Sequence, residues 1–120
     1  MNRLGIAPSK AKLLILGVAY KKDLADWRES PSIHVINRLL ANGVQITYHD
    51  PFVPEISVNG IKLYSTPLDN EILENQDLIV ITTDHSSINY VEVVNQAVAV
   101  LDTRGVTRKL DCGKEKVILL

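Results

Sequence analysis

Short apolar runs of the strand type alternate with segments of helical spacing, and this alternation most constrains what the chain can fold into. The runs lie at residues 13–17, 44–48 and 78–81. The last one reads Leu-Ile-Val-Ile, which is typical of a central parallel strand buried on both faces. Residues 31–42 instead repeat Ile33, Ile36, Leu39 and Leu40 at helical spacing. We therefore expect an α/β fold, a Rossmann-like three-layer domain with a mainly parallel sheet.

Shorter elements complete the expected alternation. We expect a short strand at 61–64, a short helix at 67–74, a helix at 90–97 and a strand at 98–101. Residues 50–60 hold two prolines and a glycine, so they are expected as a loop. Gly43 suits the C′ position after the first helix. The polar chain from Arg104 gives no assignable element before 117–120. The predicted division is an N-terminal lead-in (1–12), one domain (13–108) and a C-terminal tail (109–120).

Composition excludes several classes of function. The 120 residues, 46% of them hydrophobic, suit one domain with a real core. A formal charge of -1 with mixed signs argues against a nucleic-acid partner or an anionic membrane. The single Cys112 excludes an internal disulfide and any multi-cysteine metal site. No apolar run suits a signal peptide or a membrane span, so a cytoplasmic location is expected.

Residues 17–31 combine a strand end, a charged loop and a helix start. Ser30 suits an N-cap and Pro31 the first helical position. Ligands of open parallel sheets bind beside the carboxyl ends of the strands, where helix N-termini favour anions. Lys21 and Arg28 would add positive charge there. The loop lacks G-x-G-x-x-G, so the domain is not a convincing NAD site by itself, and Asp50 after the second strand is interpreted as a turn or cap residue.

The same loop carries a family resemblance. It reads G-V-A-Y-K-K-D-L-A-D-W-R-E-S-P, which resembles the signature that opens the C-terminal, UDP-binding domain of the UDP-glucose/GDP-mannose dehydrogenases. Three further segments follow in the family's order, at 48–51 (Y-H-D-P), 82–86 (T-T-D-H-S) and 102–105 (D-T-R-G). They look most similar to the UDP-N-acetylglucosamine 6-dehydrogenase branch. The resemblance covers roughly residues 10–108, with Asn89 and Gly105 as departures from the usual pattern.

The resemblance implies a role for four residues. Tyr20 and Lys21 look like the family residues that contact the UDP part of the substrate, and Arg104 looks like the arginine that contacts its nucleotide part. Arg28 resembles the arginine that reaches the NAD cofactor bound on another domain. Lys21 suits a phosphate as a point charge, and the planar fork of Arg104 suits a pyrophosphate.

The other polar residues have structural interpretations. The acids of the loop, Asp23, Asp26 and Glu29, are expected to pair with its basic side chains and to cap the next helix, and Trp27 to pin the loop. His34, His49 and His85 lie on different elements, so no metal site is predicted. Asp84, His85 and Ser86 are consecutive and cannot converge as a hydrolytic triad. We interpret that segment as structural.

The resemblance implies a parent enzyme of several domains. Such an enzyme oxidises the sugar C6 alcohol to a carboxylate in two NAD-dependent steps and serves cell-surface polysaccharide synthesis. The expected partners are a UDP-sugar, an N-terminal and a central domain, and further copies in a homo-oligomer. No catalytic residue is predicted here, so this chain alone is expected to be inactive. Two alternatives are a free-standing regulatory module that binds a nucleotide sugar and, far less favoured, a receiver-like domain phosphorylated on Asp84.

Overall fold

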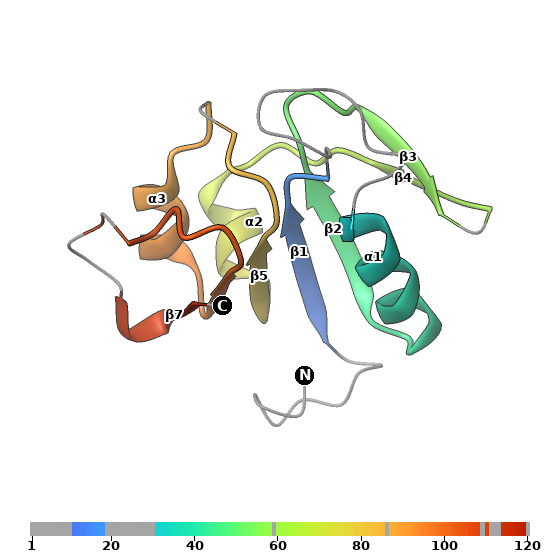
Figure 1. Ribbon diagram of the computed structural model, residues 1–120. Coiled ribbons are helices and arrows are strands. Elements are labelled where there is room, and N and C mark those ends of the chain that lie inside the picture. The colour runs from blue at the N-terminus through green and yellow to red at the C-terminus, as the bar shows by residue number, and fades with distance from the viewer. Residues whose placement is uncertain are drawn as a thin grey trace.

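Five parallel strands form the main sheet, in the order β2-β1-β5-β6-β7 (Figure 1). The structure, a computed structural model, describes residues 11–18, 31–58, 60–85, 87–108, 110 and 114–119. The strands are β1 (Lys12–Leu16), β2 (Gln45–His49), β5 (Leu78–Ile81), β6 (Val100–Asp102) and β7 (Val117–Leu119). The predicted α/β fold with a mainly parallel sheet is confirmed, and β5 is the central strand, as its apolar run indicated.

Helices cover both faces of this sheet and make it the middle of three layers. α1 (Pro31–Ala41) lies on one face, and α2 (Asn70–Glu74) and α3 (Tyr90–Gln96) lie on the other (Figure 1). Successive residues of a strand point to opposite faces, so Leu13 and Ile15 of β1 enter the α1-side core and Leu14 and Leu16 enter the other. β1 is therefore buried on both sides.

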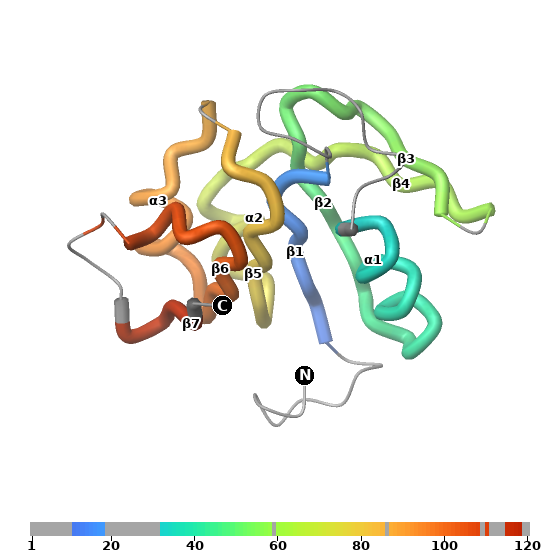
Figure 2. Tube along the Cα trace, in the orientation of Figure 1, coloured from blue at the N-terminus to red at the C-terminus, as the bar shows by residue number. Residues whose placement is uncertain are grey.

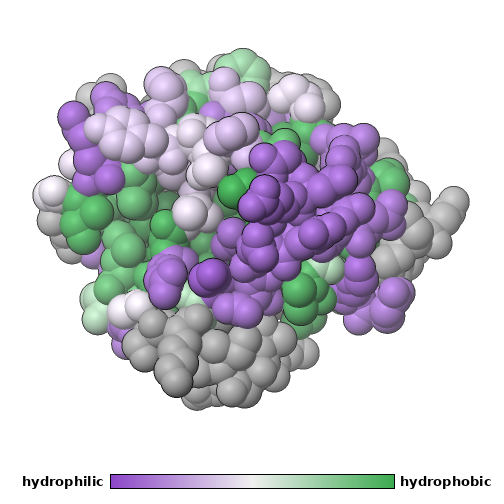
Figure 3. Space-filling view, turned by 180° about the vertical axis from the view of Figure 1, so that it is seen from behind, coloured by the Kyte–Doolittle hydropathy of each residue, from purple (hydrophilic) through white to green (hydrophobic). Residues whose placement is uncertain are grey.

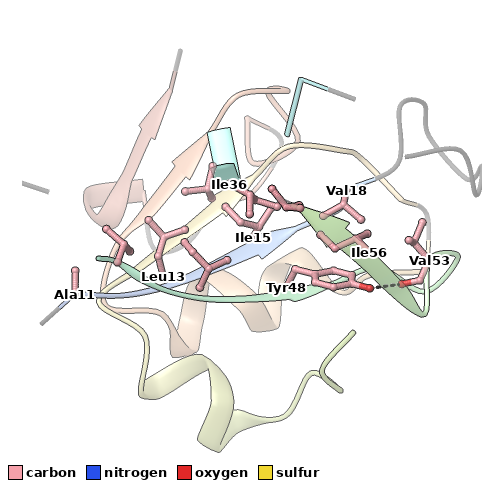
Figure 4. Close-up of a cluster of buried hydrophobic side chains, with 12 residues drawn as sticks. Ala11, Leu13, Ile15, Val18, Ile36, Tyr48, Val53 and Ile56 are labelled. Carbon is pink, nitrogen blue, oxygen red and sulfur yellow. Dashed lines mark hydrogen bonds between the residues drawn. The ribbon is translucent and has the colours of Figure 1, made fainter. Parts of the chain in front are cut away.

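The core on the α1 side confirms the helical spacing of 31–42. Ile36 of α1 is fully buried against β1 and β2, with Ile33, Leu39 and Leu40 packed around it. Tyr48 of β2 lies in the same cluster, and its hydroxyl donates a hydrogen bond of 2.9 Å to the carbonyl of Val53 (Figure 4). This bond links β2 to the chain that follows it. α1 ends as predicted, with Gly43 at a φ of 83° just beyond it.

The opposite core is built on α2 and α3. Leu73 of α2 and Val93 and Val94 of α3 pack with Ile79 and Ile81 of the central strand. Most exposed residues of both short helices are polar (70, 71, 74, 92 and 95), and Val91 is the apolar exception. Figure 3 shows this rear face, where hydrophilic residues gather over part of the surface. Both helices are therefore an outer layer with one apolar side.

Residues 50–60, expected as a loop, contain a strand. β3 (Glu55–Val58) pairs antiparallel with β4 (Ile61–Tyr64) in a separate two-stranded sheet, with Gly60 in the turn at a φ of 78°. Ile56 and Val58 are buried and alternate with exposed neighbours. The prolines precede this strand instead of interrupting it. β4 has the predicted bounds but pairs in this hairpin, which contacts the main sheet through the bridge from Tyr48 to Ser65.

Most observed bounds lie within one residue of the expectation, and three elements need separate comment. α2 begins at Asn70 instead of residue 67, because the Asp69 side chain accepts a hydrogen bond from the Ile72 N–H and caps the helix there. β6 begins at Val100, since Val98 is 61% exposed in the preceding turn. β7, in the unassigned tail, pairs parallel with β6. The division at 1–12, 13–108 and 109–120 stays a prediction, and Cys112 lies outside the described residues.

Within the described ranges, no helix has both the length and the apolar character needed to cross a bilayer.

Candidate functional site

One edge of the sheet gathers the segments that the sequence singled out. β1, β2, β5 and β6 are parallel, so their carboxyl ends meet at the same edge, with β1 between β2 and β5 (Figure 2). Gly17 follows β1, the 48–51 segment ends β2, the 82–86 segment follows β5 and the 102–105 segment ends β6. Binding sites of open parallel sheets occupy this edge. The described part of each segment therefore lies where a ligand is expected.

Gly17 makes the turn at the end of β1. It has a φ of 86°, and its N–H donates a 2.8 Å hydrogen bond to the carbonyl of His49. A Cβ on Gly17 would lie 2.5 Å from Cβ of Thr83. Thr83 therefore packs directly against Gly17 and leaves no room for a side chain at this turn. That this domain is not an NAD site by itself, as the missing G-x-G-x-x-G indicates, stays a prediction.

Two threonine hydroxyls tie neighbouring strand ends together. The hydroxyl of Thr82 donates to the carbonyl of Leu16 at 3.1 Å and also contacts the carbonyl of Gly17. The hydroxyl of Thr103 donates to the carbonyl of Ile81 at 2.7 Å. Each hydroxyl lies just beyond its own strand and continues the pairing with the neighbour. The ends of β1, β5 and β6 are therefore held in fixed relation.

Asp50 is buried at this edge and holds two backbone groups. Its Oδ1 accepts from the N–H of Phe52 at 2.8 Å, which confirms the predicted turn role. Its Oδ2 accepts from the N–H of Val18 at 2.9 Å. That oxygen also lies 2.8 Å from Nε2 of His85, and both side chains are fully buried. No local sequence pattern links this pair, because β2 and β5 lie on opposite sides of β1.

Asp102 organises the turn after β6. Its carboxylate accepts hydrogen bonds from the N–H groups of Arg104, Gly105 and Thr107 and from the Thr107 hydroxyl, the last at 2.6 Å. Burial is the largest single effect and raises the pKa of Asp102, but these hydrogen bonds outweigh it and leave the pKa below its ordinary value. The carboxylate is therefore ionised at neutral pH and fixes the backbone of residues 103–107.

Arg104 is the predicted binding residue that falls within the described ranges. Its backbone is anchored to Asp102, and the residue is exposed at the carboxyl edge. Tyr20, Lys21 and Arg28 lie outside the described residues, and so do the other residues discussed for that loop, Asp23, Asp26, Trp27 and Glu29. The structure thus places the strand ends at which the four segments begin along one edge of the sheet. The proposed contacts of loop residues 19–30 stay predictions.

The three histidines occupy separate environments. His34 is exposed on α1, His49 donates from Nδ1 to the carbonyl of Thr66 at 2.7 Å, and His85 contacts Asp50. Within the described ranges no three His, Cys, Asp or Glu side chains group in a way that could hold a metal ion.

A hollow of about 330 Å³ opens beside the sheet edge, between α2 and α3. Its walls include His49, Asp69, Asn89 and Glu92. Asp69 and Asn89 accept hydrogen bonds from the first turns of α2 and α3. The lining holds two acids and no lysine or arginine, so its charge is unsuited to a diphosphate. Among the described residues, the exposed cation of Arg104 fits such a ligand better.

Comparisons with known proteins identify the family of this chain. Residues 14–109 match the UDP-binding domain of the UDP-glucose/GDP-mannose dehydrogenase family. The chain is 35% identical over 94 residues to the UDP-N-acetyl-D-mannosamine dehydrogenase of Methanococcus maripaludis, which is 77% of this chain and 20% of that protein. It is 49% identical over 47 residues to UDP-glucose 6-dehydrogenase 1 of Arabidopsis thaliana, covering 39% of this chain and 10% of the relative. The chain spans about a fifth of the first relative's length.

Solved structures show the same fold. The UDP-D-ManNAc dehydrogenase of Pyrococcus horikoshii superposes on 98% of this chain with a TM-score of 0.72 at 24% identity, and the match covers 27% of that chain. At this identity the likeness speaks for the fold alone. The family match spans all four strand ends of the carboxyl edge. The chain therefore belongs to the UDP-glucose/GDP-mannose dehydrogenase family, of which it carries the UDP-binding domain.

Proposed function

We propose that this chain binds the UDP part of a UDP-sugar at the carboxyl edge of its sheet. It does so as a domain of an NAD-dependent dehydrogenase that oxidises UDP-N-acetylglucosamine, or a related UDP-sugar, to the uronic acid. One observation carries the proposal: the four family segments begin at the ends of four parallel strands of one sheet. Binding an unreacting part of the substrate helps catalysis, because that energy positions the reacting end.

Three residues are proposed to hold the nucleotide. Tyr20 and Lys21 contact UDP from the loop after β1, and Arg104 contacts the pyrophosphate from the turn after β6. The exposure of Arg104 and the anchoring of its backbone by Asp102 support this role. α1 starts at the same edge (Figure 1), where its first N–H groups and its dipole favour an anion. The site is thus a local cationic site on a chain of formal charge -1.

NAD and the reacting sugar belong to other domains in this proposal. The loop after β1 lacks the G-x-G-x-x-G that cradles a dinucleotide pyrophosphate, which supports a cofactor site on another domain, and Arg28 is proposed to reach the cofactor from this domain. The proposed partners are the N-terminal and central domains of a homo-oligomeric cytoplasmic enzyme, and no nucleic acid or membrane. The chain alone is expected to be inactive. A free-standing regulatory module would use the same edge, but membership of a dehydrogenase family supports the enzyme.

The relatives bear on the identity of the sugar. Their names specify UDP-N-acetyl-D-mannosamine and UDP-glucose. All of these substrates share the UDP group, which is the part assigned to this domain. The domain is therefore expected to bind UDP itself and to discriminate little among sugars.

Calorimetric titration with UDP tests the proposal. The 120-residue protein should bind UDP at millimolar concentration or tighter, and Lys21→Ala and Arg104→Ala should each weaken binding about tenfold, because each removes a charge-assisted hydrogen bond. Arg38→Ala is the matched control, since Arg38 is exposed near the end of α1, at the opposite edge. Equal effects of Arg38→Ala and Arg104→Ala would reject the proposed site.

A further inference from the structure

We propose that Asp50 and His85 form a buried latch that positions the chain leading into the UDP-binding loop. The two are positioning residues for the nucleotide and do not touch it. This inference rests on the proposed function, because its consequence is a change in UDP affinity. The latch is defined by the contact between Asp50 Oδ2 and His85 Nε2, at 2.8 Å with both side chains fully buried.

The latch joins three segments at the sheet edge. Asp50 follows β2, His85 follows β5, and the N–H that Asp50 Oδ2 accepts belongs to Val18, after β1. The Asp50 carboxylate therefore contacts the backbone N–H of Val18 in one loop and the imidazole of His85 in another. A carboxylate accepts hydrogen bonds, so we assign His85 Nε2 as the donor in this contact. Asp50 therefore fixes the position of Val18, the residue from which the chain enters the UDP-binding loop.

His85 is itself held from two sides. Its backbone N–H donates to the hydroxyl of Tyr90 at 3.1 Å, and that hydroxyl donates to the carbonyl of Thr83 at 3.2 Å. The ring of Phe52 lies 5.2 Å from the imidazole, centre to centre. Phe52 is also the residue whose N–H binds Asp50 Oδ1. The backbone of His85 is therefore anchored, and its imidazole lies between Phe52 and the carboxylate of Asp50.

The energetics favour a positioning role over a purely stabilising one. Burying a carboxylate is costly, and apolar residues of similar size often stabilise a core as well as a buried polar pair does. A polar pair adds directional geometry instead. Val18 lies two residues before Tyr20 and three before Lys21. A small displacement of Val18 would therefore shift both proposed contacts, and binding groups misplaced by about 1 Å lose much of their effect.

Two amide substitutions of His85 separate the effect of losing the hydrogen bond to Asp50 from the effect of replacing the imidazole ring. Glutamine places its amide N–H close to the position of Nε2, whereas asparagine is too short to reach Asp50. Asp50→Asn tests the other partner, since its amide N–H group would face the donors that the carboxylate accepts. Val94→Ala, in the core on the opposite face, controls for general loss of packing. UDP affinity and the hydrogen exchange of the Val18 amide are measured where circular dichroism shows each variant folded.

The latch predicts a paired result. His85→Asn and Asp50→Asn should weaken UDP binding about tenfold and speed exchange at Val18 by a similar factor, because one hydrogen bond of the network is lost. His85→Gln and Val94→Ala should stay within about threefold of the wild type in both readouts. If Asp50→Asn does not fold, the two His85 variants still decide.

Two outcomes would count against different claims. Wild-type UDP affinity in folded His85→Asn, or an equal loss in Val94→Ala, would overturn the latch. Wild-type protein that does not bind UDP would overturn the proposed function instead. Exchange at Val18 would then still show whether the pair holds the chain after β1.

Discussion

At the scale of single residues, Gly17 is needed for two separate reasons. Its φ of 86° is strained for any side chain, and a Cβ there would lie 2.5 Å from Thr83. Gly17→Ala should therefore cost about 3–4 kcal/mol of unfolding free energy, as strain and overpacking add. Gly60→Ala is the matched control, because Gly60 has a similar φ of 78° and no atom within 4 Å of an added Cβ. It should cost about 1 kcal/mol. Urea denaturation measures both, and equal costs would contradict the close approach of Thr83.

Asp102 stabilises the turn that presents Arg104, and its contribution depends on pH. Its lowered pKa means that the folded state favours the carboxylate, so the stabilisation is full above the unfolded-state pKa of about 3.9. It is lost as the pH falls through the lower, folded-state pKa. Asp102→Asn should cost about 2–3 kcal/mol at pH 7 and progressively less in acid.

Thr107→Val provides the comparison for Asp102. It removes the hydroxyl donor and keeps the carboxylate and its three N–H partners. Its cost should be about 1 kcal/mol and should vary less with pH. Denaturant titrations from pH 7 to pH 2 test both substitutions. A pH-independent gap between the wild type and Asp102→Asn would contradict the assigned role of the ionised carboxylate.

At the scale of elements, Tyr48 joins β2 to the segment that leads into the hairpin. Burial, with the nearby charges of Asp50 and Glu55, raises the pKa of Tyr48 to about 12. The folded state therefore favours the neutral phenol. Its stabilisation is complete below the unfolded-state pKa of about 10 and is lost as the pH rises towards 12.

Tyr48→Phe should reveal this titration. At pH 7 the variant loses the hydrogen bond to Val53 and should be about 1 kcal/mol less stable than the wild type. Above pH 10 the unfolded wild type ionises at Tyr48, which stabilises the unfolded state relative to the folded state. Phenylalanine has no proton to lose, so the variant does not show this effect. The stability gap should therefore shrink, and then reverse, between pH 10 and pH 12. Urea denaturation across that range measures it, and a constant gap would be the contrary result.

The elements also differ in how far the sequence predicts them. β1, β5 and α1 follow from uninterrupted periodicity, because each buries a full set of apolar residues. β3 was missed, since Pro54 and Gly60 suggested a loop although Ile56 and Val58 alternate as in a strand. β7 has three residues and depends on its pairing with β6. The spacing of apolar residues therefore predicts elements that bury a full apolar face of their own. It does not predict short strands whose stability depends on pairing with another strand.

Site residues show the same division. Arg104 could be predicted, because it directly follows a strand end within a family segment. The Asp50–His85 contact joins residues 35 positions apart that flank β1 on either side, and no local pattern links them. Asp102 belongs to a family segment in the sequence, but its four hydrogen bonds form only because the next five residues fold back towards its carboxylate. Such contacts depend on how the elements pack in three dimensions, which the spacing of residues along the chain does not show.

At the scale of the whole molecule, two apolar cores lie on either side of a parallel sheet, and its carboxyl edge is the proposed binding surface. The chain has almost no net charge, so attraction of an anion must come from a few side chains at that edge. The threonine contacts and the carboxylates of Asp50 and Asp102 hold the edge together. The surface is thus organised before a ligand arrives, which lowers the entropic cost of binding.

The central claim is that UDP binds this edge, and mapping of backbone amide shifts during a UDP titration tests it most directly. Shifts should centre on residues 17–22 and 103–105 and disappear in Lys21→Ala. The opposite edge, around Ala11, Val44, Asp77 and Ala99, should stay unperturbed and serves as an internal control. Shifts centred on that opposite edge, or none at millimolar UDP, would contradict the claim that this domain holds the nucleotide.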